Sequence, residues 1–258
     1  MLRLCRECRG SLLPPEQIGP RNNSWGGWPS AQGLTPYLVL RITIAGEPDA
    51  ATGFLVNVQE LDQVLRAQGL ATIRLRWMAG QNASESALLA AWNAILPAIP
   101  PPTSVVRLEL SLTPSLHYAI EEDGRMILVT QQFEFSAAHR LHCPDLSDEQ
   151  NLAIFGKCNN PNGHGHNYVL EITLAGEAAA HGQFIRLIDF EHVVRKQVID
   201  RFDHKDLNRD TAEFATLNPT VENITQVVWN LLDGQFGQAR LHRVRVYETP
   251  KTWAEASR

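Results

Sequence analysis

The sequence contains few cysteines, little excess charge and no long hydrophobic segment, and each of these absences excludes a class of protein. Four cysteines in 258 residues are too few for a disulfide framework, so we expect thiols in a reducing compartment. No apolar run approaches the roughly 18–20 residues that span a bilayer, and the first residues lack the pattern of a secretory signal. These absences predict a soluble, cytoplasmic protein with no membrane partner.

The charge balance excludes a further class. The formal net charge is -5 and the pI is about 6.0. A nucleic-acid-binding protein normally shows clustered lysine and arginine, so we expect no nucleic-acid partner. The composition, 44% hydrophobic and 20% charged, is that of an ordinary globular protein with room for one large domain or two small ones.

Part of the sequence occurs twice. The segment Ile42–Glu47 reappears with one change as Ile172–Glu177, about 130 residues later, which is roughly the length of a small domain. Further matches follow in the same order: Gly53–Leu55 with Gln183–Ile185, Glu85–Asn93 with Glu222–Asn230, and Thr113–Pro114 with Thr249–Pro250. The sequence therefore predicts a tandem duplication, with one repeat at residues 1–123, a second at 124–258, and a turn-like joint at Glu121–Gly124.

Each repeat is predicted to be a small α+β unit. In the second repeat, apolar residues alternate along 133–139 and 168–174, as expected for half-buried strands. Asp189 and Thr220 are predicted to cap two helices, each with one apolar face. A last strand carries Val244 and Val246 on one side. The order strand-strand-helix-helix-strand, with a further short strand, predicts an antiparallel sheet covered by helices on one face.

Three histidines form a candidate metal site. His164 and His166 lie two residues apart at the start of a predicted strand, so both imidazoles project from the same face. His139 ends the preceding strand, and pairing of the two strands brings it to the same point. Three neutral histidines with an open fourth position are typical of catalytic zinc. Polar loop histidines bound by backbone groups are the alternative, and they would explain an isolated pair better than this set of three.

Other side chains are candidates for proton transfer and for binding. Cys158 follows Lys157 and precedes a polar loop, a setting that favours the thiolate over a buried, unreactive thiol. Asp203 can orient His204 and raise its basicity, although such residues are common in turns. Glu248 shares the apolar face of Val244 and Val246, so its carboxylate needs a partner such as a ligand with adjacent N–H donors.

The first repeat serves as an internal control, because residues that serve only the fold should recur in it. Leu112 stands at the position of Glu248, Cys8 is aligned with His139, and Ala71–Arg76 replaces the Asp-His turn. The segment Asn23–Ser30 contains no His-Gly-His. Cys5 and Cys8 lack a second pair of ligands, so no metal is expected there. The proposed chemistry is thus confined to the second repeat.

These motifs resemble those of the 6-pyruvoyltetrahydropterin synthase family. The resemblance covers roughly residues 126–253 and rests on Phe135–Leu141, Cys158–His166, Asp203–Lys205, Thr220–Asn223 and Tyr247–Thr249. It implies tandem tunnelling-fold (β2α2β2) units whose sheets join into an oligomeric barrel, and elimination of triphosphate from 7,8-dihydroneopterin triphosphate.

The resemblance also implies a role for each candidate residue. The three histidines bind zinc, and Cys158, Asp203 and His204 transfer protons. Glu248, Thr220 and the backbone of Val221 bind the pterin.

Alternatives remain open for both the product and the role of the chain. A related 6-carboxytetrahydropterin synthase of the deazapurine route has fewer residues between the cysteine and the first histidine than the five found here, which favours the pyruvoyl product. A non-catalytic pterin-binding or scaffold fusion is the other alternative. Barrels of three units suggest a homotrimer in which a ring of first repeats stacks on a ring of second repeats, as a pseudo-hexamer.

Overall fold

The computed structural model describes residues 1–12, 34–121, 124–177 and 182–258. These residues form two compact units. Unit 1 comprises Met1–Val129 with Gly176–Phe184, and unit 2 comprises Thr130–Ala175 with Ile185–Arg258. The predicted joint includes residues 122 and 123, and the segment Asn23–Ser30 belongs to 13–33; both lie outside the described residues. Within the described part, no helix is both long and apolar enough to cross a membrane.

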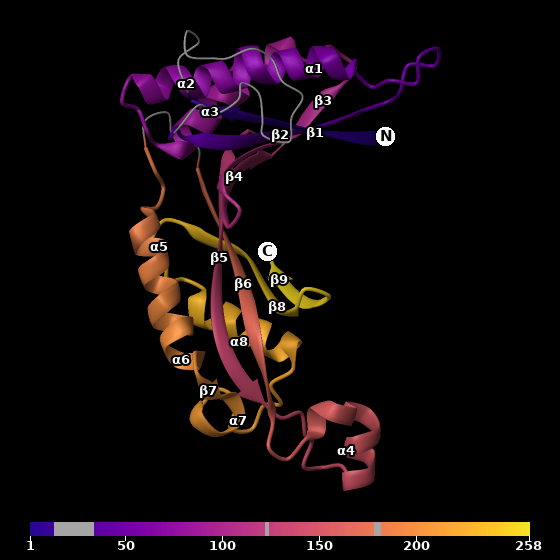
Figure 1. Cartoon of the computed structure of the whole chain (residues 1–258), viewed down its shortest axis with the longest axis vertical. Helices are drawn as coiled ribbons and strands as arrows, with labels where there is room; N and C mark the ends of the chain where they lie inside the picture. The colour runs from indigo at the N-terminus through magenta and orange to yellow at the C-terminus, as the bar shows by residue number, and fades with distance from the viewer. Residues whose placement is uncertain (13–33, 122–123, 178–181) are drawn as a thin grey trace. The chain divides into compact units, whose positions relative to one another are not determined.

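Unit 1 is an antiparallel sheet with helices on one face (Figure 1). Its strands pair in chain order: β1 (Leu2–Ser11), β2 (Tyr37–Gly46), β3 (Ser104–Thr113) and β4 (Leu116–Glu121). Its helical segments are α1 (Val58–Val64), the π-helical η2 (Leu65–Leu70), α2 (Ala71–Met78), α3 (Ser84–Ile95) and the 3₁₀ turn η3 (Leu96–Ala98). The core lies between the layers, where alternate residues of β2, namely Leu40, Ile42 and Ile44, are fully buried.

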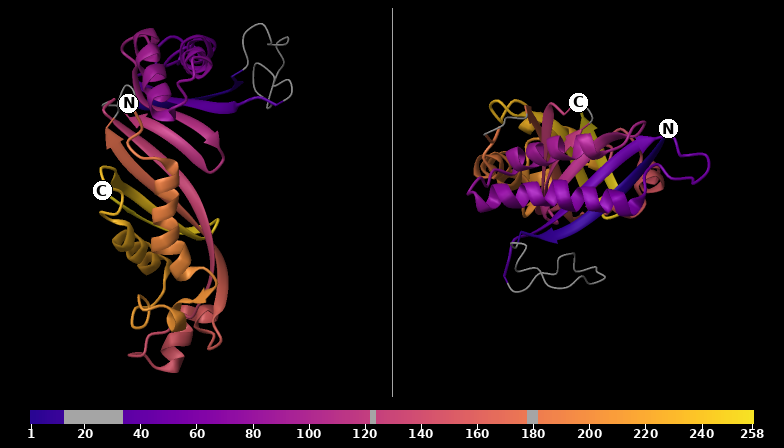
Figure 2. Two further views of the ribbon diagram at one scale, coloured as in Figure 1. Left: turned by 90° about the vertical axis from the view of Figure 1, so that its left-hand side faces the viewer. Right: turned by 90° about the horizontal axis from the view of Figure 1, so that it is seen from above.

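Unit 2 has the same layers, seen from two further sides in Figure 2. Its strands are β5 (Met126–His139), β6 (His164–Glu177), the short β7 (Lys205–Asp206), β8 (Arg240–Thr249) and β9 (Thr252–Ser257). Its helical segments are α4 (Asp148–Phe155), the 3₁₀ turn η4 (Gly156–Asn159), α5 (Leu187–Val194), the π-helical η5 (Arg195–Ile199), α6 (Asp200–Phe202), α7 (Leu207–Asp210) and α8 (Val221–Leu232). The predicted mixed α+β fold, with antiparallel strands and covering helices, is confirmed.

One of the two predicted helix caps is present and the other is wrong. The Thr220 side chain accepts a hydrogen bond from the backbone N–H of Asn223 and caps α8, as predicted. Asp189 does not cap α5, because the helix already begins at Leu187 after Arg186. The Asp189 carboxylate lies in the first turn, where the helix dipole favours negative charge, and it is bound by the Arg186 guanidinium at 2.6 Å.

The two units share irregularities that regular secondary structure does not require. The β2–β3 register shifts between Thr43 and Ile44, and the β6–β8 register shifts between Thr173 and Leu174. The registers of β3–β4 and β8–β9 also shift at corresponding places, between Ser111 and Thr113 and between Tyr247 and Thr249. Each unit also has a π-helical turn directly after its first covering helix. Bulges and π-turns are rare and conserved features, so their agreement defines equivalent positions in the two units.

This correspondence corrects one sequence alignment. Thr43 faces Cys5 and Arg41 faces Glu7 in unit 1. In unit 2, the equivalent residues Thr173 and Glu171 contact Thr130 and Gln132. Equivalent positions in β1 and β5 therefore differ by about 125 residues, so Cys8 corresponds to Phe133 and not to His139. The counterpart of His139 falls at residue 14, outside the described residues.

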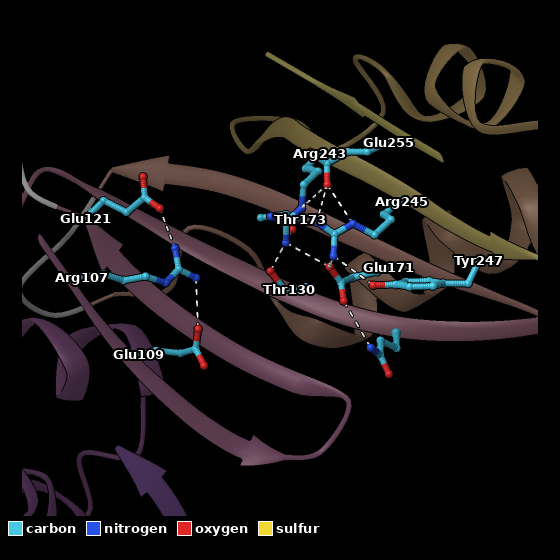
Figure 3. A network of polar contacts seen from close by, with 11 residues as sticks. Arg107, Glu109, Glu121, Thr130, Glu171, Thr173, Arg243, Arg245, Tyr247 and Glu255 are labelled. Carbon is cyan, nitrogen blue, oxygen red and sulfur yellow. Dashed lines mark hydrogen bonds and ion pairs between the residues drawn. The ribbon is translucent and has the colours of Figure 1, made fainter. Parts of the chain in front are cut away.

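The sheet face opposite the helices carries ion pairs in both units, and one pair has its signs reversed between them. Figure 3 shows Arg107 with Glu109 in unit 1, and Arg243 and Arg245 with Glu171 in unit 2. In unit 1, Arg41 on β2 pairs with Glu109 on β3. At the equivalent positions of unit 2, Glu171 on β6 lies 3.8 Å from Arg245 on β8. Arg107 and its counterpart Arg243 keep their charge, and each contacts the glutamate of its own unit, Glu109 at 3.2 Å and Glu171 at 3.0 Å.

The reversed ion pairs predict that the charges of unit 1 can be exchanged as a set. Arg41→Glu places a third carboxylate beside Glu7 and Glu109, and we expect it to destabilise the protein by roughly 1–2 kcal/mol. The triple variant Glu7→Gln, Arg41→Glu and Glu109→Arg places the residue types of Gln132, Glu171 and Arg245 at the equivalent positions of unit 1. It should recover part of that loss, because Ala119 stands where unit 2 has Glu255 beside Arg245. Urea unfolding followed by circular dichroism measures both. A triple variant less stable than the single variant contradicts the prediction.

Candidate metal centre and active site

The structure brings the three predicted histidines together. His139 at the end of β5 is fully buried, and His164 and His166 open β6. Their ring centroids are separated by 4.5 Å (His139–His164), 5.1 Å (His139–His166) and 4.9 Å (His164–His166). One nitrogen of each ring lies within 4.8 Å of the other two, a cluster that can hold a metal ion. The two-residue period of β6 and its pairing with β5 produce this convergence.

Hydrogen bonding fixes the orientation of His139. Its Nδ1 lies 2.7 Å from the Pro219 carbonyl oxygen, which can only accept, so Nδ1 carries the proton and Nε2 is free for a ligand. The Tyr168 hydroxyl lies 3.4 Å from the same Nδ1. Burial lowers the pKa of His139 to about 4, which keeps the ring neutral, the form that binds metal.

The remaining nitrogens also fit a metal ion. Nε2 of His139 is 3.1 Å from Nε2 of His164. Ligand nitrogens around a tetrahedral metal, each about 2.0–2.1 Å from the ion, are separated by roughly 3.3 Å. Nε2 of His166 is buried without a hydrogen-bond partner, a situation that costs free energy unless a ligand occupies the site.

A glycine allows the second strand to approach the first. Gly163 precedes His164 and has φ of 73°, a left-handed conformation that favours glycine. A Cβ atom added there would lie 3.1 Å from the His139 carbonyl oxygen. The Gly163 backbone N–H closes a turn onto the Asn160 carbonyl at 2.8 Å. This turn starts β6 beside the end of β5 and so places His164 next to His139.

Glu248 lies beside the histidines. It continues the face of β8 that buries Val244 and Val246, and its carboxylate is about one-fifth exposed. Oε1 of Glu248 is 3.5 Å from Nε2 of His139 and 3.6 Å from Nε2 of His166. A ligand bound by this carboxylate is therefore held next to the histidine cluster.

Cys158 lines an open pocket next to the histidines. It lies in η4, and its carbonyl oxygen accepts a hydrogen bond from the Leu141 backbone N–H at 2.9 Å. The pocket has a volume of about 940 Å³, and its lining also includes Arg140, Lys157 and His164. Cys143 does not line this pocket; its backbone N–H and carbonyl are bound by the Asn151 side chain.

Asp203 and His204 form a pair anchored to β5. The helix ends at Phe202, and His204 has φ of 58°, an uncommon conformation for a residue with a side chain. The Ser136 backbone N–H donates to Asp203 at 2.8 Å, and the His204 backbone N–H donates to the Ser136 carbonyl at 2.6 Å. The imidazole is 83% exposed, and its Nδ1 lies 2.9 Å from the Asp203 carboxylate.

The surroundings of Asp203 favour its charged form. The Ser136 N–H and then His204 hold the pKa of this carboxyl below its usual range. Neither Asp203 nor His204 lines the pocket of Cys158. Cys158 therefore belongs to this pocket, whereas the Asp203–His204 pair lies outside its lining.

Residues that the sequence did not single out connect these parts. The Asn208 side chain binds both backbone groups of Arg140, at 2.7 and 3.1 Å. Asn218 accepts from the His142 backbone N–H at 3.2 Å, and its carbonyl receives the Asn223 amide at 2.8 Å. The first residues after His139 thus hold the Asp203–Asn208 segment and the loop before Thr220 and Val221. The group of Pro219 that accepts the hydrogen bond from His139 is its backbone carbonyl, so no residue type in the sequence could have indicated this contact.

Comparisons with known proteins agree with this geometry. The sequence profile of the family described as “6-pyruvoyl tetrahydropterin synthase” matches residues 128–258. The human 6-pyruvoyl tetrahydrobiopterin synthase is 43% identical over 122 residues, which cover 47% of this chain and 84% of the human protein. The Drosophila melanogaster protein of the same name is 40% identical over 125 residues, covering 48% and 74%.

More distant proteins are also similar. The 6-carboxy-5,6,7,8-tetrahydropterin synthase of Haemophilus influenzae is 26% identical over 151 residues, covering 50% of this chain and 98% of that protein. The solved structure of Caenorhabditis elegans 6-pyruvoyl tetrahydropterin synthase aligns with a TM-score of 0.48 and 36% identity, covering 52% and 96%. The family profile matches just over half of the residues of this chain. The chain therefore belongs to the 6-pyruvoyl tetrahydropterin synthase family.

Proposed function

We propose that unit 2 is a zinc-dependent 6-pyruvoyltetrahydropterin synthase, which eliminates triphosphate from 7,8-dihydroneopterin triphosphate and tautomerises the side chain. The observation that carries this proposal is the convergence of three histidines and the Glu248 carboxylate on one point. Relatives at 40–43% identity bear the name 6-pyruvoyl tetrahydrobiopterin synthase.

His139, His164 and His166 hold the zinc ion through neutral ring nitrogens. When bound, zinc supplies Lewis-acid polarisation of the side-chain hydroxyls, which acidifies the neighbouring carbon. Glu248 accepts hydrogen bonds from the adjacent N–H donors of the pterin. Its distance of 3.5 Å from Nε2 of His139 supports a position of the pterin side chain at the histidine cluster. Thr220 and the Val221 backbone, at the start of α8, complete the pterin site.

Cys158 and His204 move the protons. The Cys158 thiolate removes a carbon-bound proton, and the electron pair forms a double bond as the carbon–oxygen bond to triphosphate breaks. His204, oriented by Asp203 at 2.9 Å, then transfers protons in the tautomerisation. Because the two residues do not share a pocket in one chain, a second copy of unit 2 supplies His204 to Cys158.

The 6-carboxytetrahydropterin alternative is less well supported. Five residues separate Cys158 from His164, and the Haemophilus influenzae relative of that activity is only 26% identical. A non-catalytic scaffold is the second alternative, and the complete set of candidate residues in unit 2 argues against it. Assay of the purified protein with dihydroneopterin triphosphate, with identification of the product, distinguishes the three.

We also infer that the chain arose by tandem duplication, with a non-catalytic repeat at 1–123 and a catalytic repeat at 124–258. Shared bulges and π-turns support this inference. The candidate chemistry is absent from the described part of the first repeat. Leu112 replaces Glu248, and Leu34 and Pro36 stand where β6 has His164 and His166. The first repeat contributes to assembly of the tunnelling-fold barrels.

Metal analysis provides the first test. Purified protein should contain about one zinc per chain, because only unit 2 holds the three histidines. Joint replacement of His164 and His166 by alanine should remove the zinc, whereas replacement of Cys5 and Cys8 should leave it unchanged. Two zinc ions per chain, or zinc retained without both histidines, would show that the assignment is wrong.

Activity provides the second test. Cys158→Ala should keep the fold and the zinc but lose most turnover, on the order of 100-fold or more, because the base for the carbon-bound proton is missing. Cys143→Ala is the matched control and should leave turnover nearly unchanged, since Cys143 does not line the pocket. Equal losses in the two variants would indicate a packing role for Cys158.

Solution mass provides the third test. Sharing of the site between copies of unit 2, together with barrels of three units, predicts a trimer of about 86 kDa, three times 28.8 kDa. Its first repeats form one ring and its second repeats the other, with three active sites in the second ring. Light scattering during gel filtration measures the mass. An active monomer contradicts both the trimer and the shared site.

A further inference from the structure

The pocket beside Cys158 contains two cations, Arg140 and Lys157, that form no ion pair within the described residues. Asp148 is the acidic residue on the same lining, and it lies exposed in the first turn of α4. The lining therefore carries a net charge of about +1 before any metal is bound. Elsewhere in unit 2, arginines commonly pair with carboxylates, as Arg201 does with Glu213 and Arg245 with Glu255.

Neutral groups hold the Arg140 guanidinium in place. Its Nε lies 3.2 Å from both the carbonyl and the side-chain oxygen of Asn159, and its Nη2 lies 3.0 Å from that side-chain oxygen. Nη2 also lies 3.3 Å from Nδ1 of His142. These contacts orient the guanidinium without neutralising its charge. A fixed and uncompensated guanidinium is suited to binding phosphate oxygens.

The position of these cations relates them to the reacting atoms. Arg140 directly follows the candidate metal ligand His139, and its anchor Asn159 directly follows Cys158. The Asn208 side chain binds both backbone groups of Arg140, so the residue is fixed from the backbone as well. Lys157 adds an exposed ammonium group to the lining of the same pocket. His164 belongs to the same lining as both cations, so the pocket connects the histidine cluster with Arg140 and Lys157.

We propose that Arg140 and Lys157 form the binding site for the triphosphate of the substrate, here called the phosphate seat. The proposal rests on the proposed function and adds the residues that recognise and release the leaving group. As the carbon–oxygen bond breaks, its electron pair goes to the triphosphate oxygen, while the carbon-bound proton goes to the Cys158 thiolate. Arg140 and Lys157 stabilise the negative charge that develops on that oxygen, and Arg140 is held in position before the reaction begins.

The test compares two ligands that differ only in the triphosphate. Binding of dihydroneopterin triphosphate and of dihydroneopterin is measured by calorimetry in the zinc-loaded, full-length Cys158→Ala protein, in which we expect turnover to be slowed on the order of 100-fold or more. The ratio of the two affinities reports what the triphosphate contributes. Lys157→Gln should lower this ratio about tenfold, and Arg140→Gln by more, with zinc content unchanged. Lys196→Gln, an exposed lysine outside the pocket, is the matched control and should leave the ratio unchanged.

A second probe keeps the two proposals separable. Magnesium tripolyphosphate is titrated into the zinc-loaded wild-type, Lys157→Gln and Lys196→Gln proteins, and the zinc content is measured afterwards. Weaker binding by Lys157→Gln alone supports the phosphate seat, even if dihydroneopterin does not bind and the pterin function fails. Equal binding by the two variants, or an unchanged affinity ratio in Lys157→Gln, overturns the phosphate seat even if the pterin function holds.

Discussion

The pairing of the end of β5 with the start of β6 is the constraint on which the candidate site depends. It places buried His139 beside His164 and His166, and the two-residue period of β6 directs the second pair to one side. The close approach requires Gly163 in a left-handed conformation beside the His139 carbonyl. A slip of one residue would turn His164 and His166 to the opposite face and dismantle the cluster.

The segment that follows β5 connects the metal centre to the rest of the site. Through backbone and side-chain hydrogen bonds, residues 140–142 hold the Cys158 turn, the Asn208 segment and the loop before α8. The Pro219 carbonyl in that loop also orients His139. The groups proposed for metal binding, proton transfer and pterin binding therefore depend on one another for their positions. A change in any of these loops affects the three histidines, because the polar side chains between the loops are half-buried and paired with one another.

The two units show how one architecture can carry chemistry in one place and not in another. In unit 1 the helix continues through Ala71–Met78, where unit 2 ends its helix at Phe202 and presents His204 in a left-handed conformation. The apolar cores and bulges are kept, because both sheets must bury the same face. The ion pairs on the opposite face have instead exchanged sign. A pair keeps its attraction when both charges are reversed together, so the two units can differ on this face and still have similar cores.

The sequence by itself determined the features that depend on local periodicity and on residue chemistry. These are the α+β layers, the shared face of His164 and His166, the position of Glu248 beside Val246, and the Thr220 cap.

Features that depend on register and long-range hydrogen bonds were decided only by the tertiary structure. The alignment of Cys8 with His139 was wrong because strand register is set by cross-strand partners. Asp189 is not a cap because α5 already begins at Leu187. Several contacts of the site join residues far apart in the chain. Ser136 anchors Asp203, Pro219 orients His139, and Asn159 holds Arg140 without neutralising its charge. Backbone groups make several of these contacts, and every residue carries the same backbone groups, so only folding specifies which of them meet.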